Sequence, residues 1–533
     1  MSSTLPHVVV VGAGPAGLAA TVELASHGCR VTLIEKNNHL GGKLNVLSEG
    51  GYTFDMGPTI LTIPQVLRGI IRRSGRKPED YLDLIDLDPQ WRCFYPDGTK
   101  IDLLKNAAEM ARSLDAQFPD LRPGAGYQKF VDWSRRMFRL SEKVFFYKDL
   151  GGIADMMRKP PTDPGMLGDV MNMRMHSTVA ATIHKHIPEP HMRQLCEHFL
   201  QYVGSSPFLA PAILGLIASA QVDQGCWYPM GGTRKVAQTL GTIAGELGVE
   251  VITGQKVKTI HADSKSARAV ELEDGRIIEA DAVVSNCDVQ RTYRDLIDEP
   301  KANAEFRAIE SKYKPACAGV VLYLGLDRQY DQLAHHNFIF SADSDAEFND
   351  IYHKGIPARD PTLYIAAPSR TDPNQAPEGG EALYILVHTA YLRDGHDWQN
   401  SPTEAGPLLK SYRETIIKKL AQAGMDDVEQ HIKLERFLTP QGIEQMYNAE
   451  GGAIYGLASH GKLAGGFKPR NRSRVYKNLY LTGGSANPGP GVPMVLMSGV
   501  TAARSVLEDH AVPTNDEWLS VRENNSSPAT AGA

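Results

Sequence analysis

A glycine-rich motif near the start of the chain, Gly12-Ala13-Gly14-Pro15-Ala16-Gly17, constrains the fold more than any other feature of the sequence. A run of valines at 8–11 precedes it and predicts a buried parallel strand, and a helical stretch follows it to about residue 27. Residues 30–35 (RVTLIE) then predict a second strand, which ends in an acid, Glu35. Together these segments predict a βαβ unit of the kind that binds a dinucleotide.

Each part of this unit has a physical role in holding a pyrophosphate. Gly12 permits the tight turn, Gly14 lets the backbone approach the phosphates, and Gly17 allows close packing of helix on strand. The helix N-terminus offers free N–H groups and the positive end of its dipole. Glu35 lies 18 residues beyond Gly17, where a carboxylate accepts hydrogen bonds from the adenosine ribose.

Composition and charge exclude several classes of protein. Lys and Arg total 56 and Asp and Glu total 62, so the formal net charge is −6 and no basic footprint for nucleic acid is present. An apolar fraction of 42% and a charged fraction of 22% are typical of a globular chain. Six cysteines in 533 residues, without a CxxC pair, favour a reducing, cytoplasmic compartment over a disulfide scaffold.

Neither a cleaved signal nor a membrane-spanning helix is predicted. The first apolar run leads directly into the glycine motif, and no apolar stretch reaches the roughly 18 residues that a span requires. Residues 208–220 (FLAPAILGLIASA) predict a short buried helix. Residues 137–158 predict an amphipathic helix broken at Gly151-Gly152, either on the protein surface or in contact with a membrane surface.

A second glycine-rich turn lies near the carboxyl end of the chain. Residues 478–482 (NLYLT) predict a strand, which continues through residues 483–493 (GGSANPGPGVP) into a helix that ends near Asp509. A glycine-rich turn between a strand and a helix N-terminus again makes a cradle for an anion or a ring.

The remaining sequence predicts six segments. They are a dinucleotide-binding segment at 1–58, a helical cap or substrate insertion at 59–225, a return to the dinucleotide fold at 226–288, a substrate domain at 289–450, a closing dinucleotide segment at 451–511 and a disordered tail at 512–533. Within 289–450, strands are predicted at 317–326 and 382–391 and a helix at 404–423.

The sequence resembles the bacterial-type phytoene desaturases of carotenoid biosynthesis, which are FAD-dependent, amine-oxidase-like flavoproteins. The resemblance covers nearly the whole chain and is strongest in the opening motif with HLGGK at 39–43, in YTFDMGPTILTIPQVL at 52–67, in YVGSSPF at 202–208 with WYPMGGTRKVAQTL at 227–240, and in the closing turn. It implies an α/β fold with a Rossmann-like FAD-binding domain of the two-dinucleotide-binding-domain type, an inserted mixed α+β substrate domain and a helical, membrane-facing cap.

The resemblance also implies the residues that hold FAD. The expected contacts are Gly12, Gly14, Pro15, Ala16, Gly17, Glu35, Lys36, Gly41, Gly42, Lys43, Gly57, Pro58, Thr59, Val257, Gly483, Gly484, Gly491, Val492 and Pro493. The motif at 39–43 favours FAD over NAD, because its match in such flavoproteins contacts the flavin end. The closing turn departs from the family, since relatives often carry Thr-His-Pro where this chain has Ala486-Asn487-Pro488. The resemblance implies that Asn487 borders the flavin.

The reaction implied is desaturation of a long acyclic isoprenoid, phytoene or its shorter diapo analogue. One hydrogen leaves as hydride to flavin N5 and the other as a proton, with oxygen or a quinone as final acceptor. The base is not assigned; Asp149, Glu197 and His198 are the titratable candidates in the predicted cap. A substrate that partitions into the lipid bilayer implies a protein peripherally bound to the membrane surface. No metal site is expected, because prolines interrupt the histidine-rich stretch 184–198.

Three alternatives remain open at this point. The first is another carotenoid reaction on the same scaffold, by an oxygenase, isomerase or saturase. The second is an amine oxidase, which requires an aromatic cage for its cationic substrate, whereas the closing turn supplies Ala, Asn, Pro and Gly. The third is a non-enzymatic prenyl-binding escort protein, which has no need of a flavin.

Overall fold

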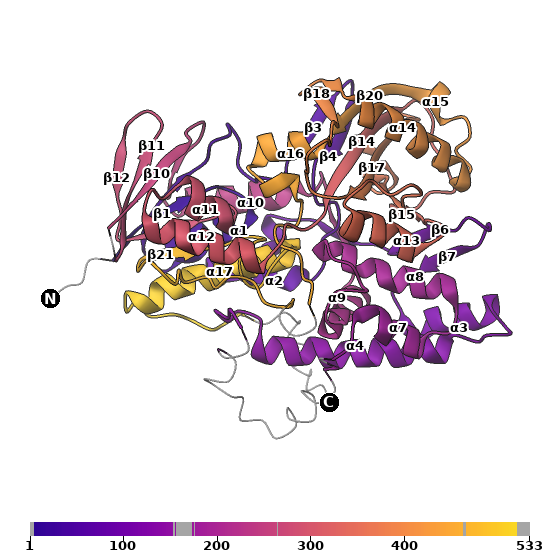
Figure 1. Ribbon diagram of the computed structural model, residues 1–533, viewed down its shortest axis with the longest axis horizontal. Helices are drawn as coiled ribbons and strands as arrows, with labels where there is room; N and C mark the ends of the chain where they lie inside the picture. Colours follow the sequence, from indigo (N-terminus) through magenta and orange to yellow (C-terminus); the bar gives the residue numbers. More distant parts are fainter. Residues whose placement is uncertain are drawn as a thin grey trace, which may run out of the picture.

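The computed structural model describes residues 5–152, 155, 173–174, 176–263, 265–461 and 465–519. Figure 1 shows three regions: a parallel sheet with its helices, a larger sheet, and a group of helices beneath the larger sheet. Segments distant in sequence meet in each region.

The first region contains a five-stranded, all-parallel sheet. Its order is β21 (Leu479–Leu481), β13 (Ala282–Ser285), β1 (His7–Val11), β2 (Arg30–Ile34) and β9 (Glu250–Ile252). The valines of β1 are all buried, because α1 (Pro15–Ser26), α10 (Arg234–Glu246) and α17 (Val492–Asp509) cover one face of the sheet, and a second layer covers the other. That second layer comprises β10 (Val257–Ala262), β11 (Ala267–Leu272), β12 (Ile277–Glu279), α11 (Val289–Asp295) and α12 (Pro300–Lys312).

The second region contains a seven-stranded mixed sheet. Its order is β20 (Ile432–Leu438), β14 (Ala318–Leu326), β17 (Glu381–Thr389), β16 (Leu363–Ala366), β15 (His336–Ile339), β6 (Trp91–Phe94) and β7 (Lys100–Leu103). The prediction of a helical insertion at 59–225 is therefore wrong for β6 and β7, which extend the substrate sheet. Their pairing depends on β15, more than 200 residues later, and a local sequence pattern does not reveal such a partner.

Both faces of this sheet are buried, and the alternation along its central strands separates two environments. On β17, Leu383, Ile385 and Val387 pack beneath α14 (Pro407–Leu420), whereas Tyr384 and Leu386 face the opposite side. The helix predicted from residue 404 begins at Pro407 instead, because residues 404–405 form a short strand, β19 (Glu404–Ala405), with β18 (Gln399–Ser401).

The third region is helical. It comprises α3 (Ala107–Gln117), α4 (Gly124–Val144), α7 (Val179–His186), α8 (Pro190–His198), η2 (Phe199–Val203), η3 (Ala212–Gly215) and α9 (Leu216–Gln224), in the lower right of Figure 1. The helix predicted at 137–158 ends at Val144, and much of its second half lies outside the described residues. Only the end of the segment 208–220 is α-helical, because Pro211 precedes a 3₁₀ turn there. Within the described ranges, no helix has both the length and the apolar character to cross a bilayer.

Shorter elements connect the three regions. They are β3 (Val46–Glu49), β4 (Tyr52–Asp55), α2 (Pro64–Arg73), η1 (Pro78–Asp80), β5 (Leu84–Asp86), β8 (Trp227–Pro229), α13 (Ser344–Asn349), η4 (Asp350–Lys354), η5 (Pro368–Arg370), η6 (Pro373–Gln375), η7 (Ala421–Ala423), α15 (Val428–His431), α16 (Pro440–Tyr447) and η8 (Glu450–Gly452).

The start of the predicted disordered tail is fixed to the protein. The Arg73 guanidinium donates to the Trp518 carbonyl at 2.8 Å, and Arg72 lies over the Trp518 ring. The prediction of disorder is therefore wrong for residues 512–519, and residues 520–533 lie outside the described part of the chain.

Candidate active site

One cavity of about 630 Å³ joins the glycine turn after β1 to the inner face of the seven-stranded sheet. All the predicted FAD contacts line it except Gly17, Gly41 and Pro493. Those lining it are Gly12, Gly14, Pro15, Ala16, Glu35, Lys36, Gly42, Lys43, Gly57, Pro58, Thr59, Val257, Gly483, Gly484, Gly491 and Val492.

The glycines of the first motif are required by close approach. A Cβ on Gly14 would lie 2.6 Å from Nδ2 of Asn286, and a Cβ on Gly17 would lie 2.0 Å from the carbonyl oxygen of Gly12. Gly17 thus sets the distance between α1 and the preceding turn without touching the cavity. Gly41 also acts from outside it, since its N–H donates to the Ala13 carbonyl at 2.8 Å.

The carboxylate of Glu35 sits at the carboxyl end of β2 and is held on both oxygens. Oε2 accepts from the backbone N–H of Ala13 at 2.8 Å, and Oε1 accepts from the backbone N–H of Asn37 at 2.9 Å. The acid therefore fixes the glycine turn as well as lining the cavity, and the cradle fits a dinucleotide.

The two predicted lysine contacts bind backbone carbonyls of α16 and of the residues that follow η8. Lys36 Nζ donates to the Gln445 carbonyl at 3.0 Å, and Lys43 Nζ donates to the carbonyls of Ala453 and Ile454, both at 3.0 Å. Burial lowers the pKa of Lys43. Their stems line the cavity while their ammonium groups bind backbone oxygens.

The sequence reasoning missed Asn286, which supports both glycine turns. It follows β13 and lies beneath Gly12, Gly14 and Gly483; a Cβ on Gly483 would be 3.0 Å from its Oδ1. Its position at the carboxyl end of a strand beside β1 is the signal that identifies it, because ligands of parallel sheets bind at that edge.

The sequence reasoning also missed the aromatic wall at the other end of the cavity. Its rings come from strands of the seven-stranded sheet and from segments that pack on it: Trp91, Tyr202, Phe338, Tyr364, Tyr384 and Tyr455. The charged residues that line the cavity, such as Glu35, Lys43 and Arg291, belong to the dinucleotide-binding region, and none comes from the large sheet among the described residues. The cavity therefore has a polar end and an uncharged aromatic end.

Two histidines lie in the aromatic wall, and burial keeps both neutral. Desolvation lowers the pKa of His388 to about 4 and holds the pKa of His198 well below its usual value. A third histidine is linked to the wall through Tyr364, whose hydroxyl lies 2.8 Å from His336 Nδ1 and 2.5 Å from Thr59 Oγ1.

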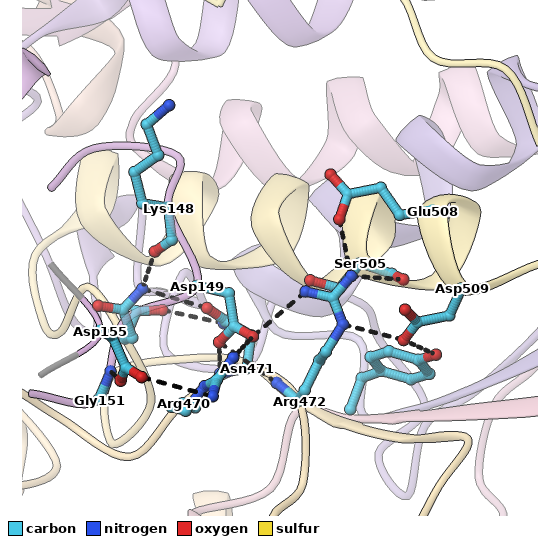
Figure 2. A network of polar contacts seen from close by, with 12 residues as sticks. Lys148, Asp149, Gly151, Asp155, Arg470, Asn471, Arg472, Ser505, Glu508 and Asp509 are labelled. Atoms are coloured by element: carbon cyan, nitrogen blue, oxygen red, sulfur yellow. Dashed lines mark hydrogen bonds and ion pairs between the residues drawn. The ribbon is translucent and has the colours of Figure 1, made fainter. Parts of the chain in front are cut away.

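Of the three candidate bases, only His198 lines the cavity. Glu197 points away from it, accepting hydrogen bonds from His184 Nε2 at 2.5 Å and Ser344 Oγ at 3.1 Å. Asp149 is buried in an ion-pair network, shown in Figure 2, where Arg470 donates to it at 2.9 Å. Glu197 and Asp149 therefore stabilise the fold through these contacts and do not reach the cavity.

Asn487 does not line the cavity: its Nδ2 donates to the Lys148 carbonyl at 2.6 Å, so the expectation that it borders the flavin is wrong. The network of Figure 2 also includes arginines of the basic stretch 468–477. Arg472 bridges Asp149 and the acids Glu508 and Asp509 on α17. Arg470 and Arg472 thus pair within the protein.

The histidines of the stretch 184–198 are dispersed in the structure. His184 pairs with Glu197, His191 lies between Glu189 and Asp97, and His198 lies among rings. Across the part of the chain that the structure describes, no group of three or more His, Cys, Asp or Glu side chains has an arrangement that holds a metal ion.

A parallel dinucleotide-binding sheet whose ligand edge opens into an aromatic chamber defines a flavin-dependent oxidoreductase. The chain belongs to the flavin-containing amine oxidoreductase family, whose model matches residues 15–507. Its cofactor is FAD. Because a non-enzymatic escort protein has no need of a flavin, that alternative is rejected.

Curated relatives extend over almost the whole chain. It is 37% identical over 500 residues to 4,4'-diaponeurosporene oxygenase of Staphylococcus haemolyticus, covering 94% of this chain and 96% of the relative. It is also 37% identical over 504 residues to 4,4'-diapolycopene oxygenase of a Methylomonas species, covering 94% and 98%. The expected membership of the carotenoid desaturase-like flavoproteins is confirmed.

Solved structures agree in fold. An oxidoreductase from Methanosarcina mazei aligns over 94% of this chain and 100% of its own, with a TM-score of 0.61 at 17% identity. A fatty acid isomerase from P. acnes aligns over 93% and 98%, with a TM-score of 0.56 at 14% identity. These likenesses extend across all three regions of Figure 1 and confirm the predicted fold class.

Proposed function

We propose that this chain is a carotenoid oxygenase, which uses FAD to oxidise the end of a long acyclic carotenoid. The observation that carries the proposal is the uncharged aromatic chamber that opens directly from the dinucleotide cradle. Relatives named diaponeurosporene and diapolycopene oxygenases, each matching over 94% of the chain, support oxygen insertion as the reaction.

In this proposal the residues of the polar end hold FAD. Gly12, Gly14 and the N-terminus of α1 receive the pyrophosphate, and Glu35 faces the ribose. Val257 would lie beside the adenine, and the two ends of the closing turn, Gly483-Gly484 and Gly491-Val492, would border the ring system. When bound, the flavin supplies two-electron redox chemistry and reacts with oxygen.

The chamber favours a hydrocarbon over an amine. The amine oxidase alternative requires an aromatic cage, which the closing turn lacks, yet strands of the large sheet supply aromatic residues. The stronger argument is electrostatic. A buried cation needs a carboxylate partner, and no Asp or Glu lines the sheet side of the cavity in the described residues.

The protein's part in the chemistry is to orient the chain end, exclude water and accept a proton. His198 is the residue we propose for the last role, because it is the one of the three titratable candidates that lines the cavity. Asp149 and Glu197, the other two candidates, are engaged elsewhere.

Desaturation is the second candidate, and the motifs at 52–67 and 202–208 favour it because they resemble phytoene desaturases. The same chamber serves a carbon–carbon bond in mid-chain if the substrate slides further past the flavin. For either reaction we also propose a peripheral position on the cytoplasmic membrane surface and oxygen or a quinone as electron acceptor.

Pigment analysis of cells that make an acyclic carotenoid and co-express the chain tests the proposal. We expect 4,4'-diaponeurosporene or 4,4'-diapolycopene to be converted to products that have gained oxygen. Loss of two hydrogens per step from a colourless precursor, without oxygen, would identify a desaturase instead. Unchanged carotenoids in cells that contain the flavin-loaded protein would contradict both candidates.

A further inference from the structure

A polar patch lies on the uncharged wall of the cavity, where a pure hydrocarbon has no use for it. His198 comes from the end of α8, Gln201 from η2 and His388 from β17, and all three line the cavity. They are 6%, 3% and 4% exposed, and the ring centroids of the two histidines are 6.4 Å apart.

The hydrogen-bonding capacity of this patch is largely unused by the protein. Gln201 accepts a bond from the Tyr352 hydroxyl at 3.4 Å through Oε1, but its Nε2 has no partner among the residues described. His388 meets the Tyr455 hydroxyl only at 3.4 Å through Nε2. His198 makes ring contacts, the nearest with Phe338 at 4.7 Å between centroids. Because a buried, unpaired polar group is costly, such a patch indicates a ligand that pairs with it.

The chemistry of the patch selects the ligand. A neutral imidazole carries one donor and one acceptor nitrogen, and the Gln201 amide adds donors. Neither the large sheet nor η2 brings a charged side chain to this wall within the described ranges, so an ammonium or a carboxylate would remain unpaired. A neutral oxygen function, hydroxyl or carbonyl, fits both the donors and the acceptors.

We propose that His198, Gln201 and His388 form a subsite for an oxygen atom at the end of the carotenoid, so that an end-hydroxylated or aldehyde-bearing carotenoid binds more tightly than the parent hydrocarbon. The inference rests on the proposed function and specifies its substrate class. An end that has gained its first oxygen is thereby retained in the cavity rather than released.

Equilibrium binding to the holoprotein tests this subsite. Quenching of tryptophan fluorescence is followed as the protein, anaerobic and with its FAD reduced beforehand to prevent turnover, is titrated with 4,4'-diapolycopene or with its derivative bearing one terminal hydroxyl. We expect the hydroxylated ligand to bind roughly tenfold more tightly. In Gln201→Leu and His388→Leu this preference is lost, while affinity for the hydrocarbon and FAD content are unchanged.

Gln221→Leu is the matched control. Gln221 is a buried glutamine whose Nε2 also lacks a partner in the described residues, but it does not line the cavity. The control should keep the preference. Equal affinities in the wild type, an equal loss for both ligands in the variants, or loss of FAD from the variants would overturn the subsite and leave the proposed function intact. If neither ligand bound, the proposed function would fall, and the subsite with it.

Discussion

At the scale of single residues, the cofactor cradle depends on places where a side chain has no room. Gly14 and Gly17 meet Asn286 and the Gly12 carbonyl at distances that a Cβ does not tolerate. The sequence motif predicted the close packing at Gly17, because it follows from backbone geometry that every such turn shares, whereas the approach of Gly14 to the phosphates stays a prediction. It did not predict Asn286, whose role appears only once β13 pairs with β1.

We expect Gly17→Ala to destabilise the protein by about 1–3 kcal/mol or more, since the methyl group must displace backbone rather than a flexible side chain. Gly245→Ala is the control: Gly245 is also helical, in α10, and an added Cβ meets nothing within 4 Å. It should change stability by less than about 1 kcal/mol, in the favourable direction. Urea unfolding measures both, and equal effects would contradict the packing role of Gly17.

Lys468 is a buried ammonium whose protonation links stability to pH. Its Nζ donates to the Ala458 carbonyl at 3.0 Å and Ser459 Oγ at 2.7 Å, and burial lowers its pKa from 10.5 to about 7. The folded state disfavours the charged form, so this group's contribution to stability is present at high pH and is lost as pH falls from 10.5 through about 7.

We therefore expect the wild type to gain stability relative to Lys468→Met as pH rises from about 7 towards 10.5. Chemical denaturation of both proteins across this range measures the difference. Because the two proteins share every other titratable group, the contribution of those groups cancels in the difference between their free energies of unfolding. A difference that stays constant or shrinks with rising pH would show that Lys468 remains charged in the folded protein.

At the scale of elements, the ion-pair network around Asp149 fastens the loop after α4 to the closing turn. Asp149 receives the guanidinium of Arg470 at 2.9 Å and the backbone N–H of Asn471 at 2.7 Å (Figure 2). Asn471 in turn donates to the carbonyls of Leu481 and Asn487. The local sequence does not reveal this network, because the acidic partners of Arg470 and Arg472 lie more than 30 residues away in sequence.

We expect Asp149→Asn to cost about 1.5–3 kcal/mol of stability, because two partly buried guanidinium groups lose the carboxylate that they share. FAD should also bind more weakly, since the closing turn loses its anchor. Glu429→Gln is the control, because Glu429 is 62% exposed and Arg413 keeps its second partner. Thermal unfolding and flavin release measure the two effects. An Asp149 variant as stable as the control would contradict the anchoring role.

At the scale of the whole molecule, the sequence predicted the parts that depend on local pattern. The βαβ unit, the return strands at 249–286 and the closing strand–turn–helix occur within a few residues of the predicted bounds. The chamber was not predicted, because its wall combines β6, β15, β16 and β17 with η2. From the sequence alone, a tyrosine on a buried strand is interpreted as a core residue. Only the folded structure shows that Tyr364 and Tyr384 line the same cavity as the dinucleotide-binding glycine turns.

The proposed function requires one cavity to bring FAD and the end of a carotenoid together. To test this, the purified holoprotein is incubated in liposomes with 4,4'-diapolycopene under isotopically labelled dioxygen, and the mass of the product is measured by mass spectrometry. We expect a carotenoid that carries label, and none from protein stripped of FAD. A product that loses hydrogen without gaining label, or an unaltered carotenoid with FAD bound, would contradict this expectation.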